Sequence, residues 1–554
     1  MTFLRAFILG GLLSQIPTIT NASTRAEITQ KKVAANPKLS WWDAMDTGPF
    51  ISDTFLGFGP KGEVAALKGI AIKLGGKKDH TVVFDTETLR MVAGFKGNVM
   101  LEGTPWSGKH NDNSYLPESR KDYFFATNKG PGVAVNENWD DLRNTKNGPL
   151  PDARGEYHGL YRHEAGTVLS YSVGGAKFLE MPKLYEKTLV RSFEFEPLKT
   201  DVEILVLDPL EGGREIDVAL SNVPKGVALK TLPSGRVVVS LATGASGSFE
   251  LAYLAKGTRI LIEKRGSIKN FTKGGPSLFP EVIKTKGRTS KDAKGYAVDD
   301  IPLPKDNPWE SNIRFGAFDF FSDGKRAACS TWNGDVWIAE GIDGDLTGIT
   351  WRRFASGLFQ TLGLKIVDDV IYTHGRDQLT RLHDLNNDGE ADFYECFNND
   401  VLITSGFHEF AFDLQTDKEG NFYFSKGAPV LSGGRGFSDL TEHNGAILKV
   451  SADGKTLTRM AWGLRAPGGL GLGPNGELTT GENEGSYVPR CKITWSKPDG
   501  SSFHGVVPSV WDNKKFVRNL PATPTDYERP LSCLPSYVDN SRRSQFWVPN
   551  ARSW

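Results

Sequence analysis

The feature that most constrains this chain is a strand–turn–strand pattern that repeats through its second half. An apolar strand, a tight turn that ends in Gly and a second strand occupy residues 315–331, and the pattern returns at 410–425 and 468–480. A third strand follows the first two copies, at 335–339 and 446–450. Units of this kind that recur every roughly 40–55 residues are typical of β-propeller blades, and an unrelated set of hairpins is the alternative. The repeats predict four blades and part of a fifth.

The propeller predicted from these repeats covers residues 311–554 and is incomplete. The last residues, 546–554, have the pattern of another strand that begins where the sequence ends. A propeller closes its ring in order to protect its last strand edge. We therefore expect the chain to be a shortened form of a longer protein.

The first half differs in texture and predicts a separate domain over residues 41–268. Its segments 80–85, 188–195, 202–208 and 236–241 are rich in β-branched and aromatic residues and are bounded by turn-forming residues. They predict an antiparallel β-sandwich-like domain, with a helical insert at 136–148. The Gly- and Pro-containing stretch 269–310 is interpreted as the linker. The chain is thus predicted to be all-β.

The N-terminus indicates export. Residues 1–5 carry one positive charge and no acid, an apolar stretch runs from Ala6 to about Pro17, and small residues lead to Ala22. This order predicts a signal peptide over residues 1–22, and a buried helix is the alternative. A leader at 23–40 follows. The apolar stretch is shorter than the roughly 20 residues that cross a bilayer, so we expect a secreted or periplasmic protein without a membrane span.

Composition excludes some partners and leaves the cysteines open. The 66 basic and 66 acidic side chains balance, so no strong field points to nucleic acid. No C-x-x-C-H motif is present, so this chain carries no covalent haem. Export would permit a Cys491–Cys533 disulfide, with buried free thiols as the alternative.

An acidic segment fits the template of a calcium-binding loop. Residues 384–395 match D-x-[DN]-x-[DN]-G-x5-E along their whole length. The segment lies between two predicted strands, so the site would be a calcium loop in a β context, and an acidic turn without metal is the alternative. The predicted ligands of a structural Ca2+ are Asp384, Asn386, Asp388, Glu390, Asp392 and Glu395.

Two polar positions next to predicted inner strands are candidates for chemistry. His408 begins one such strand and would face the central channel, where it could act as a general base. Arg465 lies in a Gly- and Pro-rich turn before the next repeat, where its guanidinium could bind a carboxylate or a quinone oxygen. A hydrogen-bonded structural histidine and an arginine that braces its turn are the alternatives.

Three weaker candidates lie in the first half. His158, His163 and Glu164 are close in sequence, but their spacing suits no standard metal template. Trp106 and Trp139 could stack on sugar rings, although buried aromatic residues are commoner.

Residues 312–547 resemble the soluble glucose/sorbosone dehydrogenase type of propeller. The likeness is carried by His408 at a strand start, by the segment G-L-R-A-P-G at 463–468 and by the acidic loop. In that family a histidine base and an arginine flank pyrroloquinoline quinone, and calcium helps to hold the quinone. The resemblance therefore implies a propeller of the six-bladed type, with His408 as the base in hydride abstraction and Arg465 as the partner of the quinone.

The chain as a whole resembles large secreted proteins of planctomycetes and verrucomicrobia. These proteins pair a β-rich domain of unknown function, number 6797, with such a propeller. The likeness is carried by residues 41–49, 83–89, 530–535 and 539–541. Relatives often continue into a c-type haem domain, so the resemblance implies a c-type cytochrome partner or a missing domain.

Two functions compete at this point. The first is an exported recognition module for carbohydrate or protein, favoured because no complete catalytic set is visible. The second is a quinone-dependent dehydrogenase of sugars or other polyols, favoured by His408, Arg465 and the resemblance. A propeller alone does not decide between them, because this fold hosts many activities.

Overall fold

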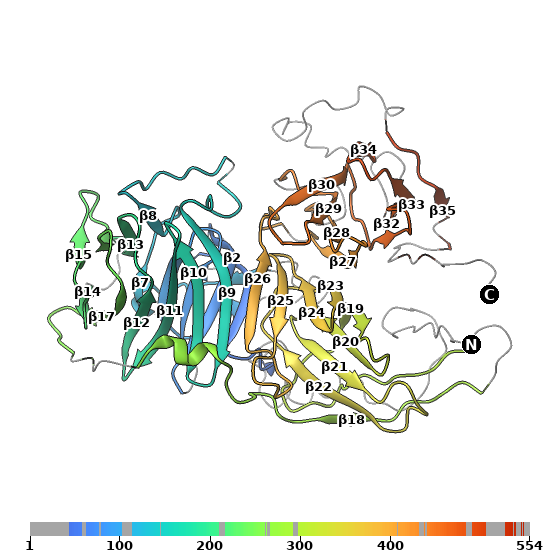
Figure 1. Ribbon diagram of the computed structural model, residues 1–554, viewed down its shortest axis with the longest axis horizontal. Helices are drawn as coiled ribbons and strands as arrows, with labels where there is room; N and C mark the ends of the chain where they lie inside the picture. Colours follow the sequence, from blue (N-terminus) through green and yellow to red (C-terminus); the bar gives the residue numbers. More distant parts are fainter. Residues whose placement is uncertain are drawn as a thin grey trace.

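The structure is a computed structural model in which nearly all ordered elements are β-strands (Figure 1). It describes residues 44–57, 63–76, 79–101, 113–144, 146–209, 216–260, 262, 266–291, 297–406, 408–430, 437, 440–483, 490–505, 527–535, 537–538, 545 and 547. The predicted signal peptide and leader lie outside the described residues. The predicted all-β class is confirmed.

The first layer of the N-terminal part is a seven-stranded sheet. Its strands in spatial order are β5 (Met100–Leu101), β6 (Ser114–Tyr115), β1 (Phe50–Leu56), β2 (Val64–Leu74), β3 (His80–Asp85), β4 (Arg90–Lys96) and β7 (Tyr123–Ala126). All neighbours are antiparallel except β1 and β6, which are parallel. The strands are rich in β-branched and aromatic residues, which favour the pleated, half-buried surface of a sheet.

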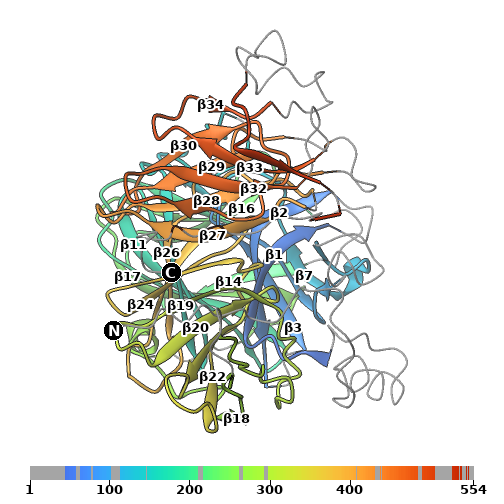
Figure 2. The same ribbon diagram turned by 90° about the vertical axis from the view of Figure 1, so that its right-hand side faces the viewer.

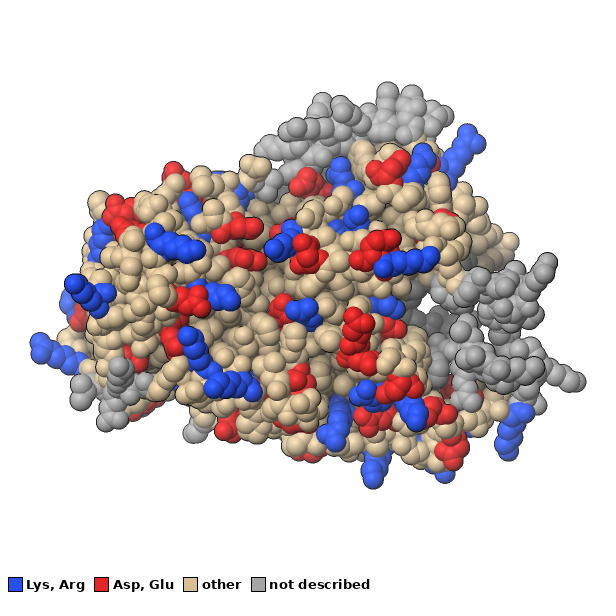
Figure 3. All heavy atoms as spheres, viewed as in Figure 1, with Lys and Arg blue, Asp and Glu red and all other residues tan. Residues whose placement is uncertain are grey.

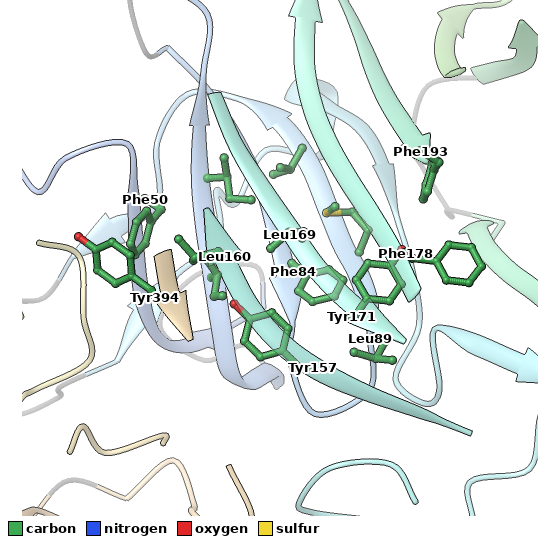
Figure 4. Close-up of a cluster of buried hydrophobic side chains, with 14 of the residues drawn as sticks. Phe50, Phe84, Leu89, Tyr157, Leu160, Leu169, Tyr171, Phe178, Phe193 and Tyr394 are labelled. Atoms are coloured by element: carbon green, nitrogen blue, oxygen red, sulfur yellow. The ribbon is translucent and has the colours of Figure 1, made fainter. Parts of the chain in front are cut away.

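The second layer belongs to a ten-stranded sheet. Its first six strands in spatial order are β14 (Ile216–Ser221), β17 (Gly247–Ala255), β12 (Thr188–Phe195), β11 (Ala176–Tyr185), β10 (Gly166–Val173) and β9 (Gly155–His163). Apolar side chains from the two layers form the main core, among them Phe84, Leu169 and Phe178 (Figure 4). The rings of Phe84 and Tyr171 stack with centroids 5.8 Å apart. This packing confirms the sandwich-like first domain.

A smaller sheet completes the N-terminal part. Its strands are β15 (Val227–Thr231), β16 (Val237–Leu241), β13 (Val202–Leu207) and β8 (Val133–Val135). The predicted helical insert at 136–148 is wrong. The described residues of that segment form turns, with a single bridge between Val135 and Asn138. Asn136 and Glu137 have positive φ, which breaks a helix.

The second half contains the blades that the repeats predict. The first blade is β19 (Phe315–Phe320), β20 (Arg326–Thr331), β21 (Val336–Glu340) and β22 (Ile349–Ala355), extended by β18 (Ile283–Thr285). The second is β23 (Gly363–Val367), β24 (Val370–His374), β25 (Leu379–His383) and β26 (Phe393–Asn398). Their innermost strands, β19 and β23, lie in contact.

Two further blades follow and lie above the first in the side view of Figure 2. The third is β27 (Ala411–Thr416), β28 (Phe422–Lys426), β29 (Ala446–Val450) and β30 (Leu457–Trp462), with β34 (Ser502–Phe503) parallel to its outer edge. The fourth is β31 (Gly471–Leu472), β32 (Leu478–Glu482), β33 (Cys491–Ser496) and β35 (Ser532–Leu534). The described residues thus hold four consecutive blades of a propeller.

The two halves share one continuous sheet. Strand β26 of the second blade pairs antiparallel with β9 of the first domain, with Phe393 opposite Tyr161 and Glu395 opposite Gly159 (Figure 1). On the core side of this seam, the ring of Tyr394 meets that of Phe50 edge-on at 5.1 Å (Figure 4). The blade therefore contributes both backbone pairing and apolar side chains to the core of the first domain.

The remaining predictions concern cysteines and helices. Strands β33 and β35 bring Cys491 and Cys533 near one another, but Cys491 lies opposite Leu534 and Cys533 opposite Lys492. Neighbouring positions along a strand point to opposite faces, so one thiol is buried, the other is exposed and both are free. The proposed disulfide is wrong. The described helices are two short 3-10 turns, η1 (Arg120–Asp122) and η2 (Ile268–Thr272), and none could cross a bilayer.

Candidate functional site

His408 and Arg465 lie in equivalent loops of neighbouring blades. Residues 399–410 lead from β26 into the inner strand β27, and residues 463–470 lead from β30 into the inner strand β31. The loop after β28 joins them, because the backbone N–H of Ala428 donates to the carbonyl of Arg465 at 2.9 Å. His408 lies close enough to Arg465 for the guanidinium charge to lower the pKa of its imidazole. The structure thus brings the two predicted residues together.

His408 is held in an uncommon conformation and in its neutral form. Its φ of 67° is in the left-handed region, which costs a non-glycine residue on the order of 1 kcal/mol. Burial lowers the pKa of its imidazole, the charge of Arg465 lowers it further, and a hydrogen bond with the backbone of Val430 partly offsets both. The imidazole is therefore neutral at pH 7 and can accept a proton.

The loop that carries His408 is fixed by the carboxylate of Glu409, which is fully buried. This carboxylate accepts from the backbone N–H of Thr404 at 2.8 Å and forms ion pairs with Arg376 at 3.1 Å and Lys426 at 2.9 Å. The amide of Asn444 donates to Oε1, the oxygen that Lys426 also contacts. These contacts come from three neighbouring turns and strands. They therefore fix the conformation of the loop from several sides and can hold the strained backbone of His408 in place.

Arg376 closes the other side of the same loop. Its Nη2 donates to the carbonyl of Thr404 at 3.0 Å and to that of Gly406. Its Nε and Nη1 are buried and have no hydrogen-bond partner among the described residues. Burial lowers the pKa of the neighbouring Lys426 to about 8, and its pairing with Glu409 offsets part of that effect. Buried hydrogen-bond donors therefore gather beside the His408 loop.

Arg465 is positioned by Glu482 at the end of β32. The Oε1 atom of Glu482 accepts from the backbone N–H groups of Arg465 at 2.9 Å and of Ala466 at 2.7 Å. The Arg465 Nη1 donates to the carbonyl of Asn483 at 2.9 Å. Burial raises the pKa of Glu482 to about 6, and Lys492 and the two backbone donors oppose that rise. Arg465 as a whole residue is half-buried.

The arrangement combines a neutral base with a cationic hydrogen-bond donor. A neutral imidazole can take the proton of a hydroxyl group, and a guanidinium can stabilise an oxygen on which negative charge develops. Such a pair suits removal of a proton from an alcohol together with stabilisation of an anionic oxygen nearby.

The acidic loop gives no support to the predicted calcium site. Asp384 accepts from the backbone N–H groups of Asp388 and Gly389, Asn386 from that of Asp388, and Asp388 from that of Glu390. These contacts are those of Asx turns. Among the described residues, no three His, Cys, Asp or Glu side chains are grouped so that they could hold a metal ion.

The last three predicted ligands bind protein groups instead of converging on one point. Glu395 lies on β26 and pairs with Arg381 at 2.6 Å and with His383 at 2.6 Å. Glu390 accepts from the backbone of Leu278 and Phe279 at 2.7 and 2.9 Å. The described residues therefore give the predicted Ca2+ ligand set no support: the loop fits the sequence template, but its side chains bind arginine, histidine and backbone groups.

The weaker candidates of the first domain do not form a metal site either. His158 and His163 lie on β9, and the register shift against β10 leaves His158 without a partner in that strand, whereas His163 is paired with Gly166. The His163 ring packs edge-on against Phe271 at 5.1 Å, and its Nδ1 accepts from the backbone N–H of Ala165. Trp139 donates to Glu203 at 2.8 Å, and Trp106 lies outside the described residues.

Sequence reasoning missed the partners of Glu409. Arg376 lies in a polar turn, and Lys426 ends a strand otherwise built of core residues. One feature of the sequence could have indicated Arg376. It lies in the turn between the second and third strands of its blade. That turn is at the same end of the blade as the loop that enters the next inner strand.

Residues 82–180 match the family described as "Domain of unknown function (DUF6797)". This match covers parts of both sheets of the sandwich and ends before the propeller. No curated protein matches the chain in sequence.

Several solved structures with a partial likeness are sugar dehydrogenases. A protein described as an oxidoreductase (glucose dehydrogenase) from Thermus thermophilus is 17% identical, with 40% of this chain and 71% of that chain covered and a TM-score of 0.30. The aldose sugar dehydrogenase of Streptomyces coelicolor, in its PQQ-bound form, is 14% identical, with 43% and 74% covered and a TM-score of 0.29. The PQQ domain of pyranose dehydrogenase from Coprinopsis cinerea is 11% identical, with 45% and 64% covered and a TM-score of 0.29.

Proposed function

We propose that the propeller face bearing His408 and Arg465 is the active site of an oxidoreductase that oxidises a hydroxyl group of a sugar or another polyol. The observation that carries this proposal is the neutral imidazole of His408 beside the guanidinium of Arg465. The two residues are 57 positions apart in sequence and lie near one another because the loop after β28 is hydrogen-bonded to the Arg465 turn. A strained backbone at His408, held by buried ion pairs, is typical of a functional position.

In the proposed reaction His408 accepts the proton of the substrate hydroxyl. The carbon that bears the hydroxyl loses its hydrogen as hydride, so the substrate becomes a carbonyl compound and an acceptor gains two electrons. We propose pyrroloquinoline quinone as that acceptor, and when bound it supplies an ortho-quinone that takes the hydride. Arg465 would donate hydrogen bonds to an oxygen of the acceptor, since the residue is only half-buried.

The buried donors beside His408 suit an acceptor rich in oxygen atoms. Arg376 has two N–H groups without a partner among the described residues, and Lys426 shares the carboxylate of Glu409 with it. An additional anionic group nearby would lower the cost of these buried cations. The acidic loop at 384–395 contributes nothing to this site, and no calcium ion is included in the proposal.

The test is a titration of the folded chain with pyrroloquinoline quinone, followed by dye reduction with a panel of sugars and polyols. We expect His408→Asn to retain binding and lose turnover at least roughly 100-fold, as expected for a general base. We expect Arg465→Ala to weaken binding roughly tenfold or more. Arg288→Ala, at an exposed ion pair, is the control and should change neither quantity. Absence of quinone binding by the folded wild type would refute the proposal.

A recognition module that carries out no chemistry remains the competing prediction. In that case His408→Asn and Arg465→Ala would alter affinity for a glycan or protein ligand, while no dye reduction would occur with any substrate. Export and a cytochrome partner also remain predictions. Mass spectrometry of the N-terminus of secreted protein tests the first, and reduction of an added c-type cytochrome during turnover tests the second.

A further inference from the structure

A wide cleft lies along the seam where the two halves share their sheet. Its volume is about 1000 Å³, and its floor is the outer face of β9, β10, β11 and β26. Walls are added by residues near η2 and by the turn between β29 and β30. Neither His408 nor Arg465 lines it, so the cleft is separate from the proposed active site. The corresponding face of the molecule is seen in Figure 3.

An aromatic ladder across three strands places two of its rings on the floor of the cleft. These are Tyr161 and Phe393, which stack with centroids 4.2 Å apart and planes at 14°. The third ring, His383, stacks on Phe393 at 5.5 Å and lies outside the lining of the cleft. Tyr161 and Phe393 are directly opposed cross-strand neighbours in the seam. Both rings are only partly buried, so they present apolar surface to the cleft. Such rings can contact the C–H faces of a ligand.

The polar groups of the cleft are fixed around this ladder. The Nε and Nη2 atoms of Arg381 donate to the two oxygens of the Glu395 carboxylate at 2.6 and 2.9 Å, and His383 contacts the same carboxylate. These contacts lower the pKa of the Glu395 carboxyl against the effect of burial, so the carboxylate is a permanent acceptor. The Nε2 atom of His158 is buried and has no hydrogen-bond partner among the described residues. Burial lowers the pKa of His158, so its ring is neutral at pH 7.

Charges of both signs surround the floor. Glu156, Glu194 and Glu395 line the cleft together with Lys177, Arg381 and Lys455. On this face, acidic and basic side chains are interspersed instead of gathered by sign (Figure 3). The whole lining has seven acidic and five basic side chains, so it gives no positive field that would favour a phosphate or another anion, and it offers donors and acceptors side by side. Vicinal hydroxyl groups, each of which donates and accepts, match that lining.

We infer that this cleft binds a neutral oligosaccharide. The volume is at the upper end of the range of roughly 300–1,000 Å³ for small-molecule sites, which favours a chain of several sugar units over a monosaccharide. The aromatic ladder would contact the apolar faces of the sugar rings, while Glu156, Lys177 and the exposed part of the His158 ring would bind their hydroxyl groups. A cleft at the joint between the two halves would allow the chain to hold a glycan independently of any chemistry at His408.

The test is affinity electrophoresis of the full chain in gels that contain barley β-glucan, galactomannan, arabinoxylan or a sulfated polysaccharide. We expect at least one neutral polysaccharide to retard the wild type. We expect His158→Asn and Tyr161→Ala each to raise the apparent Kd by roughly five- to tenfold, as for the loss of one hydrogen bond or ring contact. His163→Asn on the same strand and Tyr185→Ala on β11 are matched controls that should leave retardation unchanged.

Three results would overturn the inference: no retardation by any of the neutral polysaccharides, retardation by the sulfated one alone, or retardation that survives both cleft variants. Circular dichroism of each variant separates loss of binding from loss of folding, and Glu156→Gln, at an exposed side chain, provides a second test without risk to the fold. His408→Asn should bind the polysaccharide like the wild type. Failure of the proposed oxidoreductase and failure of the glycan site are therefore distinguishable.

Discussion

Arg162 of the first domain forms an ion pair of 3.0 Å with Asp392 of the propeller loop that resembles a calcium site. The same guanidinium lies 3.3 Å from Glu390 and donates to the carbonyls of Ala391 and Pro276 at 2.9 and 3.1 Å. All three charged side chains are almost fully buried. Arg162 therefore supplies positive charge to two of the residues that the sequence template assigns to Ca2+.

This contact connects three separate parts of the chain. Arg162 lies on β9, its carboxylate partners lie between β25 and β26, and Gly275 donates its backbone N–H to Asp392 at 3.0 Å. The ion pair thus stands at the end of the β9–β26 seam and fixes the segment that connects the two halves. We expect the two halves to unfold together, since backbone pairing, apolar packing and buried charge all cross this junction.

Removing Arg162 should strongly destabilise the chain. In Arg162→Met the carboxylates of Glu390 and Asp392 would stay buried without their cation, which costs about 3–5 kcal/mol for a buried pair of this kind. Urea denaturation followed by tryptophan fluorescence measures the loss. Arg288→Met is the control, because the Arg288–Asp300 pair is exposed and contributes little.

The loss should also depend on pH. Burial raises the pKa of both Glu390 and Asp392 even with Arg162 present, and removal of the guanidinium would raise both values further. A carboxyl whose folded pKa is raised binds more protons in the folded state, so its unfavourable contribution shrinks as the pH falls. The penalty of Arg162→Met should therefore be larger at pH 8 than at pH 5. An equal penalty at both values would contradict the role assigned to the ion pair.

Chelation should leave the stability of the chain unchanged. The predicted ligands bind protein groups, so calcium has no assembled site in the acidic loop. We expect the midpoint of thermal unfolding to be the same, within about 1 °C, with 1 mM EDTA and with 1 mM CaCl2. An ion at 100 times its Kd would add about 2.7 kcal/mol, a shift of several degrees. Such a shift, lost in Asp384→Asn, would restore the calcium interpretation.

Much of the propeller could be predicted because its signals are local. The predicted turns contain Gly324, Gly420 and Gly476, and all three adopt the positive φ that favours glycine. Each is followed by the expected second strand. The positions of His408 and Arg465 before inner strands were likewise readable from the repeat.

The seam and the true role of the acidic loop could not be predicted, because both depend on contacts distant in sequence. Arg162 and Asp392 are separated by 230 positions, and nothing in either segment indicates its partner. The calcium-loop template describes only the spacing of side-chain oxygens along the chain. It cannot indicate that the guanidinium of Arg162, from the first domain, binds two of these side chains. The cleft was missed for the same reason, since Tyr161 and Phe393 become neighbours only when β9 and β26 pair.

The conformation of His408 predicts an unusual ranking of substitutions. Because its φ is 67°, glycine should be accommodated better than alanine. We expect His408→Gly to be more stable than His408→Ala by about 1 kcal/mol in urea denaturation, and neither variant to show turnover. At a position with an ordinary φ, glycine is instead the less stable of the two. An alanine variant that matches or exceeds the glycine variant would show that the loop is not held in the left-handed conformation.

The burial of Glu482 predicts a pH dependence that a neutral substitution should remove. Its folded pKa of about 6 lies above its ordinary value near 4.5. Between these values the folded chain keeps a proton that the unfolded chain has released, so Glu482 makes the wild type less stable as the pH rises through this window. Glu482→Gln retains an oxygen that can accept from the backbone of Arg465 and Ala466, and it carries no charge.

The stability of Glu482→Gln relative to wild type should therefore increase by up to about 2 kcal/mol between pH 4.5 and pH 7. Urea denaturation at pH 4.5, 5.5 and 7 measures the difference. Glu477→Gln is a matched control in the turn before the same strand, where hydrogen bonds from Asn475 lower the pKa of an exposed carboxyl. A lowered folded pKa gives the opposite slope, so the two variants should diverge with pH. If the stabilities of the two variants relative to wild type changed with pH in the same way, Glu482 would not be a buried carboxyl with a raised pKa.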